Sequence, residues 1–420
     1  MSSEPVRDVP ARGRPGFGVA AGAGGGADTG AGAGPLVGVD AGRLRPAWAE
    51  VDLDAIRHNA AVLAEEAAPA QLCAVVKAGG YGHGAVPAAR AALEGGASRL
   101  AVALVEEGRE LREAGIDAPV LLLSEPTPAA MAEVVSLGLT PAIYTPAGLE
   151  AVVAAVRAVD TGAPFPVHVK VDTGMHRVGA TPEEAVALAE AVSRHPELEL
   201  EGVWTHFAVS EEIGNPYTAR QLAFFEDTLA RLAAVGVRPA LRHAANSAAA
   251  LWIPQSRYDM VRCGIALYGL APDAGATSRP PADRLRRALA IKARVTYVKE
   301  VTAGERLSYG LRYRLQRDSV IATVPLGYAD GVTRGLSAVG GEVLVAGRRC
   351  PIAGTVTMDQ LLVDCGPGAV VARGDEVVLL GRSGDEEITA WEWAQRTGTI
   401  AYEVVCGISG RVPRVYPDAL

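Results

Sequence analysis

The sequence has few cysteines, no long apolar run and no basic run. Its five cysteines, Cys73, Cys263, Cys350, Cys365 and Cys406, are scattered, without a C-x-x-C pair or the spacing of metal ligands. This pattern is typical of free thiols in a reducing, cytoplasmic compartment and predicts no metal site. No stretch is long and apolar enough to span a bilayer. The formal net charge of −8 argues against a partner such as nucleic acid or an anionic membrane.

The first 45 residues differ in composition from the rest of the chain. Gly, Ala and Pro dominate this segment, as in the run at residues 20–27. Such a segment cannot bury enough apolar surface to offset the entropy lost on ordering. It also lacks the continuous apolar stretch of a secretory signal. We therefore predict a disordered tail over residues 1–45, without a catalytic role.

From Trp48 onwards, short apolar runs alternate with segments rich in Ala, Leu and Glu. Residues 54–66 carry apolar side chains at helical spacing and predict a helix. Eight β-type runs separated by helical segments predict a (β/α)8 TIM-type barrel over residues 46–285. The predicted barrel strands are Leu72–Val76, Arg99–Ala103, Val120–Leu123, Thr140–Tyr144, Val167–Val171, Val203–His206, Leu241–Ala244 and Met260–Cys263.

The alternation of strand-like and helix-like segments ends after about residue 282. Runs such as Ala293–Val298, Ser319–Val324 and Glu376–Leu380 are joined by Gly-rich turns, with few helical segments between them. This pattern favours a separate, mostly β domain over residues 286–420. The fold class is therefore α/β, a TIM-type barrel followed by a mostly β C-terminal domain.

Lys77 directly follows the first predicted barrel strand, where α/β barrels place their chemistry. Taken alone, it could be a surface lysine just past a strand. The glycine-rich turn behind it, residues 79–84, lets the backbone approach a ligand and brings Tyr81 and His83 into the same turn. Burial and nearby cations lower the pKa of a lysine, which makes its amine able to form a Schiff base.

Further polar residues follow the later strands. Arg177 carries a fork-shaped donor suited to a carboxylate, although it could equally cap a helix. Lys170 ends the fifth strand, where an unpaired ammonium is costly and needs a partner. His206 ends the sixth strand, and a single histidine there is often a satisfied core residue.

The loops after the seventh and eighth strands contain Asn246-Ser247 and Arg262-Cys263-Gly264-Ile265. In such barrels these two loops commonly form a phosphate cup of backbone N–H groups and a hydroxyl, although either alone is ordinary turn chemistry. Together with an amine on the first strand, they favour a phosphate-bearing carbonyl cofactor, and pyridoxal 5'-phosphate fits.

With these motifs in view, the chain from Trp48 onwards resembles bacterial alanine racemases of the pyridoxal-phosphate barrel class. The motifs that carry the resemblance are Val75-Val76-Lys77 with Tyr81-Gly82-His83-Gly84, Lys170 with Asp172-Thr173-Gly174-Met175-His176-Arg177, Thr205-His206-Phe207, Ala245-Asn246-Ser247, Arg262 with Gly264-Ile265-Ala266-Leu267-Tyr268-Gly269, Ser308-Tyr309-Gly310, Gly327-Tyr328-Ala329-Asp330-Gly331 and Met358-Asp359-Gln360.

The resemblance implies a homodimer that interconverts L-alanine and D-alanine with two proton carriers and so supplies D-alanine for peptidoglycan. Lys77 would bind the cofactor and act as one acid/base, and Tyr309 of the partner subunit would be the other. The resemblance assigns the remaining site residues as follows: Arg262 to the pyridine nitrogen, held by His206; Tyr81, Asn246, Ser247, Gly264 and Ile265 around the phosphate; Arg177 and the Met358 backbone to the substrate carboxylate; Lys170 as a carbamate paired with Arg177; and Tyr328 and Asp359 in support.

Three positions depart from the pattern of the family: Gly79 stands where Asn or Asp is usual, Thr357 replaces a cysteine, and Gly410 stands where some members have a tyrosine. The loss of that ring predicts a wider gate, which leaves open a broader-specificity racemase that also accepts serine. Two further alternatives remain. A barrel-type decarboxylase of basic amino acids would need an acidic distal pocket, and a small non-enzymatic cofactor-binding barrel would lack residues 286–420.

Overall fold

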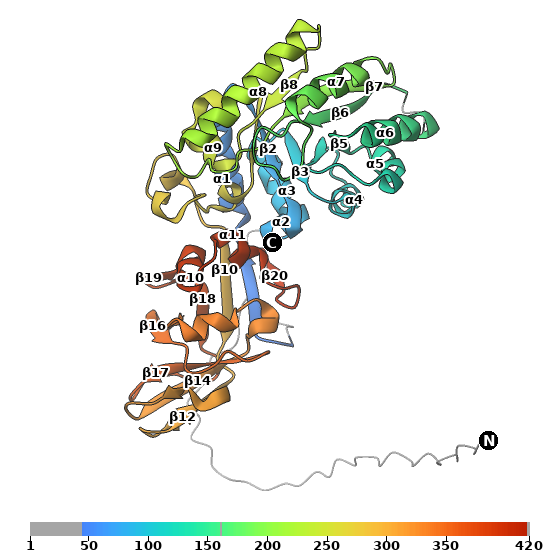
Figure 1. Ribbon diagram of the computed structural model, residues 1–420. Coiled ribbons are helices and arrows are strands. Elements are labelled where there is room, and N and C mark those ends of the chain that lie inside the picture. The colour runs from blue at the N-terminus through green and yellow to red at the C-terminus, as the bar shows by residue number, and fades with distance from the viewer. Residues whose placement is uncertain (1–43, 160–161, 418–420) are drawn as a thin grey trace, which may run out of the picture. The chain divides into compact units, whose positions relative to one another are not determined.

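The computed structural model describes residues 44–159 and 162–417 (Figure 1). The tail predicted over residues 1–45 lies outside the described residues except for its last two. Of these, Arg45 donates from Nη1 to Oδ1 of Asp330 at 2.8 Å and from Nε to the carbonyl of Pro325 at 2.9 Å. Arg45 is therefore part of the folded structure. Within the described ranges, no helix combines the length and the apolar character needed to cross a membrane.

The predicted barrel is confirmed. Eight parallel strands form one sheet, in which the first seven pair in sequence order and the eighth pairs with the first. The edges of the seventh and eighth strands, which remain, are joined by two backbone hydrogen bonds of 3.0 Å. These run from Asp259 N to Arg242 O and from Arg262 N to Ala245 O. The strands are β2 (Gln71–Val75), β3 (Arg99–Val102), β4 (Val120–Leu122), β5 (Thr140–Ile143), β6 (Phe165–Lys170), β7 (Leu198–Trp204), β8 (Leu241–His243) and β9 (Met260–Cys263).

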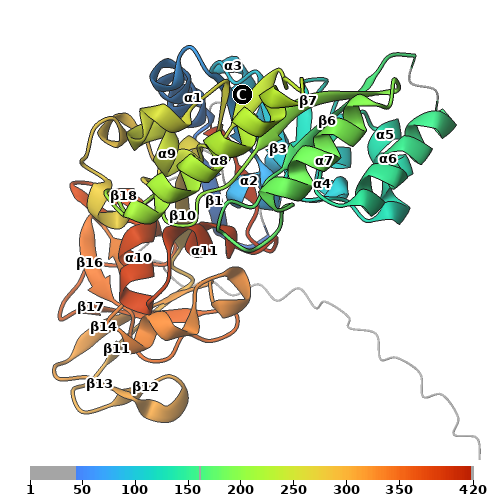
Figure 2. The same cartoon turned by 45° about the horizontal axis from the view of Figure 1, so that its top comes forward.

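Helices alternate with these strands and cover them from outside, as α7 and α8 do in Figure 2. The predicted helix at residues 54–66 is α1. It begins after Asp52, whose side chain accepts from the Ala55 amide, and it buries Ile56 and Leu63. The α-helices of this half are α1 (Leu53–Ala67), α3 (Ala85–Glu94), α4 (Val105–Glu113), α5 (Met131–Ser136), α6 (Pro146–Val159), α7 (Pro182–Ser193), α8 (Pro216–Ala234) and α9 (Ser247–Trp252). The segment α2 (Lys77–Tyr81) is a short turn with left-handed backbone angles.

The chain from β10 onwards is mostly β, as predicted. It forms part of a seven-stranded sheet in the order β16-β15-β18-β10-β1-β20, with β19 paired to β18, together with a three-stranded sheet and a hairpin. Among residues 289–417, the α-helices are α10 (Ala390–Thr397) and α11 (Ala401–Cys406), and the other helical segments are short 3₁₀ turns. The strands are β10 (Leu289–Arg294), β11 (Tyr297–Val301), β12 (Arg306–Leu307), β13 (Tyr313–Arg314), β14 (Ser319–Val324), β15 (Glu342–Val345), β16 (Arg348–Pro351), β17 (Leu361–Gly366), β18 (Glu376–Ser383), β19 (Glu386–Ile388) and β20 (Arg414–Val415).

Two features of this half differ from the sequence expectations. The strand β1 (Ala47–Val51) falls in the range predicted for the barrel, but it pairs with β10 and β20. The predicted single strand Ala293–Val298 is wrong, because β10 ends at Arg294 and β11 begins at Tyr297 in another sheet. In contrast, β14 has the predicted bounds, and all six of its residues are buried.

Candidate active site

A cavity of about 580 Å³ lies at the carboxyl ends of the barrel strands. Most of the sequence-predicted site residues line it, because parallel strands bring their carboxyl ends to one rim. The lining residues predicted from sequence are Lys77, Tyr81, Lys170, Arg177, His206, Asn246, Ser247, Arg262, Gly264 and Ile265.

Lys77 opens a tight left-handed turn. Ala78, Gly79, Gly80 and Tyr81 all have positive φ angles, between 52° and 63°. Gly79 tolerates this conformation without strain, and no atom lies within 4 Å of the position a Cβ would take there. Burial, followed by repulsion from Arg177, lowers the pKa of the Lys77 amine. A lower pKa increases the neutral, nucleophilic fraction of this amine near neutral pH.

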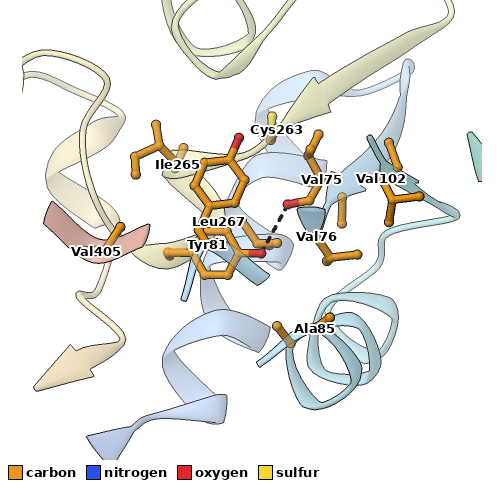
Figure 3. Packing of buried hydrophobic residues seen from close by; sticks show 14 of the residues in the cluster. Val75, Val76, Tyr81, Ala85, Val102, Cys263, Ile265, Leu267 and Val405 are labelled. Carbon is orange, nitrogen blue, oxygen red and sulfur yellow. Dashed lines mark hydrogen bonds between the residues drawn. The ribbon is translucent and has the colours of Figure 1, made fainter. Parts of the chain in front are cut away.

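Tyr81, Ser247 and Gly264 form one end of the cavity. A Cβ at position 264 would lie 2.3 Å from the Tyr81 hydroxyl, so that only glycine allows this approach. The buried Ser247 hydroxyl accepts from the Gly264 amide at 3.0 Å. In Figure 3, Tyr81 lies in the buried cluster that also contains Ile265 and Val405. A hydroxyl-lined recess with glycine at its wall has the chemistry needed to accept a phosphate.

Arg262 is buried and held by several acceptors. Its Nη1 donates to Nδ1 of His243 at 2.8 Å, and its Nη2 donates to the carbonyls of Thr205 and Ala244 at 2.8 and 3.0 Å. Its Nε has no protein partner in the part of the chain that the structure describes. Burial lowers the pKa of Arg262 to about 10, which still leaves the guanidinium charged near neutrality.

A chain of hydrogen bonds leads from Arg262 into the barrel. Since the arginine can only donate, Nδ1 of His243 must accept, and Nε2 of His243 then carries the proton. That Nε2 lies 2.9 Å from Nδ1 of His168, whose own Nε2 lies 2.9 Å from Glu201. Burial lowers the pKa of both histidines and keeps them neutral, whereas hydrogen bonds from His168 and Arg99 outweigh burial and lower the pKa of Glu201 to about 2.

His206 lies farther from Arg262 than His243 does. The Nη2 of Arg262 lies 3.3 Å from Nδ1 of His206, a longer separation than the 2.8 Å to His243. Burial and the adjacent Arg262 and Arg177 keep the pKa of His206 well below its ordinary value. A neutral His206 can therefore accept a hydrogen bond at the cavity wall without adding a positive charge.

Lys170 and Arg262 both lie close to the ring of Trp204. The Lys170 Nζ lies 4.3 Å from the centre of the Trp204 ring, and the Arg262 Cζ lies 4.5 Å from it. The Trp204 ring also stacks on His243 at a centroid distance of 5.5 Å. Burial, followed by repulsion from Arg262 and Arg177, lowers the pKa of Lys170 to about 7. The electron-rich indole face offsets part of this charge crowding.

Lys170 should make stability depend on pH. The folded pKa of about 7 lies below the ordinary lysine value, so the unfolded chain binds more protons between about pH 7 and pH 10. In bicarbonate-free buffer, the free energy of unfolding should therefore rise from pH 7 to pH 9 by about 1–2 kcal/mol more than in Lys170→Met. Urea unfolding at both pH values measures this difference. Equal slopes for the two proteins would contradict the lowered pKa.

The site residues predicted in the C-terminal half do not line the cavity. Tyr309 is 73% exposed and Met358 is 52% exposed, and Tyr328 and Asp359 are also exposed. The loop that carries Met358 is tied to a neighbouring segment, since the amides of Tyr328 and Ala329 donate to Thr357 O and Met358 O at 2.9 and 3.1 Å. The single chain thus brings the predicted barrel residues together at one cavity, whereas the predicted residues of the C-terminal half lie apart from them on the surface.

Thr357 and Gly410 are two of the positions that depart from the pattern of the family. The Thr357 hydroxyl donates to the Gln360 carbonyl at 2.8 Å and so closes the turn that carries Met358. Gly410 is exposed and does not line the cavity, whereas Tyr402 does. The ring of Tyr402 lies 6.3 Å from that of Tyr81. Tyr402 thus supplies an aromatic ring at this wall, and the wider gate inferred from Gly410 stays a prediction.

Sequence reasoning missed Tyr402, Trp204 and His243 as residues of this site. Trp204 and His243 are the last residues of β7 and β8, so their position at strand ends was a usable signal. Tyr402 and its neighbour Cys406, which also lines the cavity, come from α11. No local pattern connects this helix to the barrel rim.

The chain matches models of known protein families over most of its length. Residues 51–272 match the alanine racemase N-terminal domain, and residues 288–416 match the alanine racemase C-terminal domain. The alanine racemase of Symbiobacterium thermophilum is 50% identical over 378 residues, which is 90% of this chain and 99% of that protein.

Solved structures agree with this assignment. The alanine racemase of the D-cycloserine producer Streptomyces lavendulae aligns with a TM-score of 0.83 and 41% identity, covering 90% of this chain and 98% of that one. The Bacillus anthracis alanine racemase, solved with bound L-Ala-P, aligns with a TM-score of 0.82 and 39% identity over 89% of this chain and 95% of that one. The chain therefore belongs to the alanine racemase family.

Proposed function

We propose that this protein interconverts L-alanine and D-alanine with pyridoxal phosphate as its cofactor. The observation that carries this proposal is the placement of Lys77, whose amine lines the cavity at the barrel rim together with Arg262 and Ser247. Within the family to which the chain belongs, that arrangement supports a racemase.

The residues around the cavity fit the proposed cofactor. The amine of Lys77 would hold its carbonyl carbon, and Arg262 retains Nε as a donor for a ring nitrogen. Tyr81, Ser247 and the backbone at Gly264 and Ile265 would hold the phosphate, in the recess that a side chain at position 264 would fill. When bound, pyridoxal phosphate withdraws electrons from the α-carbon of an amino acid and so makes its α-proton acidic.

The chain itself would supply two proton carriers. Lys77 would remove or deliver the α-proton on one face of the substrate, and Tyr309 of the partner subunit would act on the other face. A racemase needs one such group on each face, since inversion moves the proton from one side of the α-carbon to the other. The exposure of Tyr309 on a braced loop supports a homodimer in which this residue reaches the cavity of the other subunit.

The substrate carboxylate would be bound by Arg177 and the backbone at Met358. Arg177 is exposed at the cavity, where its guanidinium can form a bidentate pair. We also propose that Lys170 is carbamylated: its lowered pKa leaves a neutral amine whose nitrogen can bond to the carbon of CO₂ and release one N–H proton to solvent. The resulting anion would pair with Arg177 and relieve the crowding of cations at Arg262.

The proposed activity is tested by incubating the protein with pyridoxal phosphate and L-alanine in D₂O. Deuterium should appear at the α-carbon as D-alanine accumulates, and the protein should gain the near-visible absorbance of a lysine-bound cofactor. Turnover of serine at a rate comparable to that of alanine would identify the broader-specificity racemase that Gly410 leaves open. Release of CO₂ from lysine or ornithine without α-proton exchange would instead identify a decarboxylase, and bound cofactor without exchange would identify a binding protein.

The five cysteines of the chain are free thiols. They support our proposal that the protein works in a reducing compartment such as the cytoplasm.

A further inference from the structure

Two residues near the end of the described chain, Arg414 and Tyr416, form hydrogen bonds to the turn that follows Lys77. The Tyr416 hydroxyl donates to the carbonyl of His83 at 3.1 Å, and Nε of Arg414 donates to the carbonyl of Gly82 at 2.9 Å. We call Arg414 and Tyr416 the C-terminal clasp. Its two acceptors are backbone groups of the same turn that carries Tyr81 into the cavity.

Arg414 is itself held firmly. Its Nη1 donates to the carbonyls of Ser409 and Val412 at 2.6 and 2.8 Å, and its Nη2 donates to the carbonyl of Ile408 at 2.6 Å. The strand β20, which begins at Arg414, also pairs with β1. The guanidinium therefore joins the turn to a segment that is anchored in a sheet.

Two glycines make this contact possible. A Cβ at Gly82 would lie 2.2 Å from the carbonyl oxygen of Val405, and a Cβ at Gly84 would lie 2.1 Å from the Tyr416 hydroxyl. Both glycines have positive φ angles, 82° and 99°. The Gly-His-Gly sequence is thus shaped for close approach of the C-terminal segment as well as for the turn itself.

The turn needs an external restraint. Ala78 and Tyr81 adopt positive φ angles of 54° and 52°, a conformation unfavourable for residues with a Cβ. Such a conformation persists where surrounding contacts hold it, and the clasp supplies two such contacts at the end of the turn. The other end is held by the 2.6 Å hydrogen bond from the Ala78 amide to Glu107.

We propose that Arg414 and Tyr416 are positioning residues for the cofactor site: they hold the turn so that Lys77 and Tyr81 are already oriented towards the cavity before the cofactor binds. The inference rests on the proposed function for the identity of the cofactor. It extends that function to residues at the opposite end of the sequence, which do not line the cavity.

The test compares Tyr416→Phe with Tyr297→Phe in the full-length protein. Tyr297 is 60% exposed on β11 and serves as the matched control. One lost hydrogen bond should weaken binding of pyridoxal phosphate to the apoprotein by about 3- to 10-fold in Tyr416→Phe. Absorbance titration measures this affinity. The control should bind like the wild type.

Hydrogen–deuterium exchange of the apoprotein gives a readout that needs no cofactor. The amides of Gly80, Gly82, His83 and Gly84 all donate within the turn at 2.7–3.0 Å. The peptide that contains them should exchange faster in Tyr416→Phe, with protection elsewhere unchanged. Arg414→Lys should act in the same direction.

Unchanged exchange in this peptide, or unchanged cofactor affinity in Tyr416→Phe, would overturn the inference. A uniform rise in exchange over the whole chain would also overturn it, since that result indicates a general stabilising role. If the wild type binds no pyridoxal phosphate while the local exchange effect is present, the cofactor assignment fails and the clasp is retained as a restraint on the turn.

Discussion

Lys77→Ala should lower kcat/KM for alanine racemisation by at least about 10⁴-fold. The substitution removes the only amine proposed to hold the cofactor and one of the two proposed proton carriers, and each role alone is worth roughly 10²–10⁴-fold. The polar cavity around it would remain, so the folded structure should survive. The initial rate of D-alanine formation, measured in the presence of saturating pyridoxal phosphate, gives the value directly.

Lys299→Ala is the matched control, because Lys299 is an exposed lysine on β11 that does not line the cavity. It should keep full activity. Borohydride reduction of the cofactor-loaded wild type, followed by peptide mass spectrometry, should place the cofactor on Lys77 alone. Activity above about 1% of wild type in Lys77→Ala, or a label on another lysine, would contradict its proposed role.

The barrel part of the site could be predicted from the sequence because its geometry follows from topology. Lys77, Lys170 and Arg262 lie at or next to the carboxyl ends of β2, β6 and β9, and a parallel barrel brings these ends to one rim. Once the strands are recognised, side chains at their ends must converge. No long-range packing detail is needed for that conclusion.

Residues that approach the site from outside the barrel could not be found in this way. Tyr402 and Tyr416 reach the turn after Lys77 through packing of segments more than 300 residues apart in sequence. The strand β1 has the composition of an ordinary strand, and nothing local shows that it pairs with β10. The left-handed conformation of Ala78 and Tyr81 is likewise set by contacts, since their own preferences oppose it.

The exposure and the backbone hydrogen bonds of Tyr309 suit a residue that contacts another chain. It is 73% exposed, but its backbone is braced because Thr355 Oγ1 donates to its carbonyl at 2.9 Å and the Ser308 hydroxyl donates to Thr355 O at 2.7 Å. An exposed aromatic residue on a backbone that hydrogen bonds already hold in place loses less entropy when a partner covers it. This geometry supports a role for Tyr309 in the cavity of the partner subunit.

Tyr309→Phe should lower kcat for racemisation by about 10³-fold, because it removes only the hydroxyl that carries the proton. Lys77 should still exchange the α-proton on its own face, so deuterium from D₂O should enter one alanine enantiomer much faster than the other. Tyr297→Phe should show neither effect. If Tyr309→Phe exchanged deuterium equally fast into L-alanine and D-alanine, another group would have to act on the second face.

Mixing inactive Lys77→Ala with Tyr309→Phe then tests whether the two groups come from different chains. If sites are shared, each hybrid dimer contains one site with both Lys77 and Tyr309 and one site with neither. Random exchange of subunits should therefore restore about one quarter of wild-type activity. If each chain used its own Tyr309, every site in the hybrid would lack one group. Absence of recovery, with hybrid dimers demonstrated by native mass spectrometry, would then require a site built within one chain.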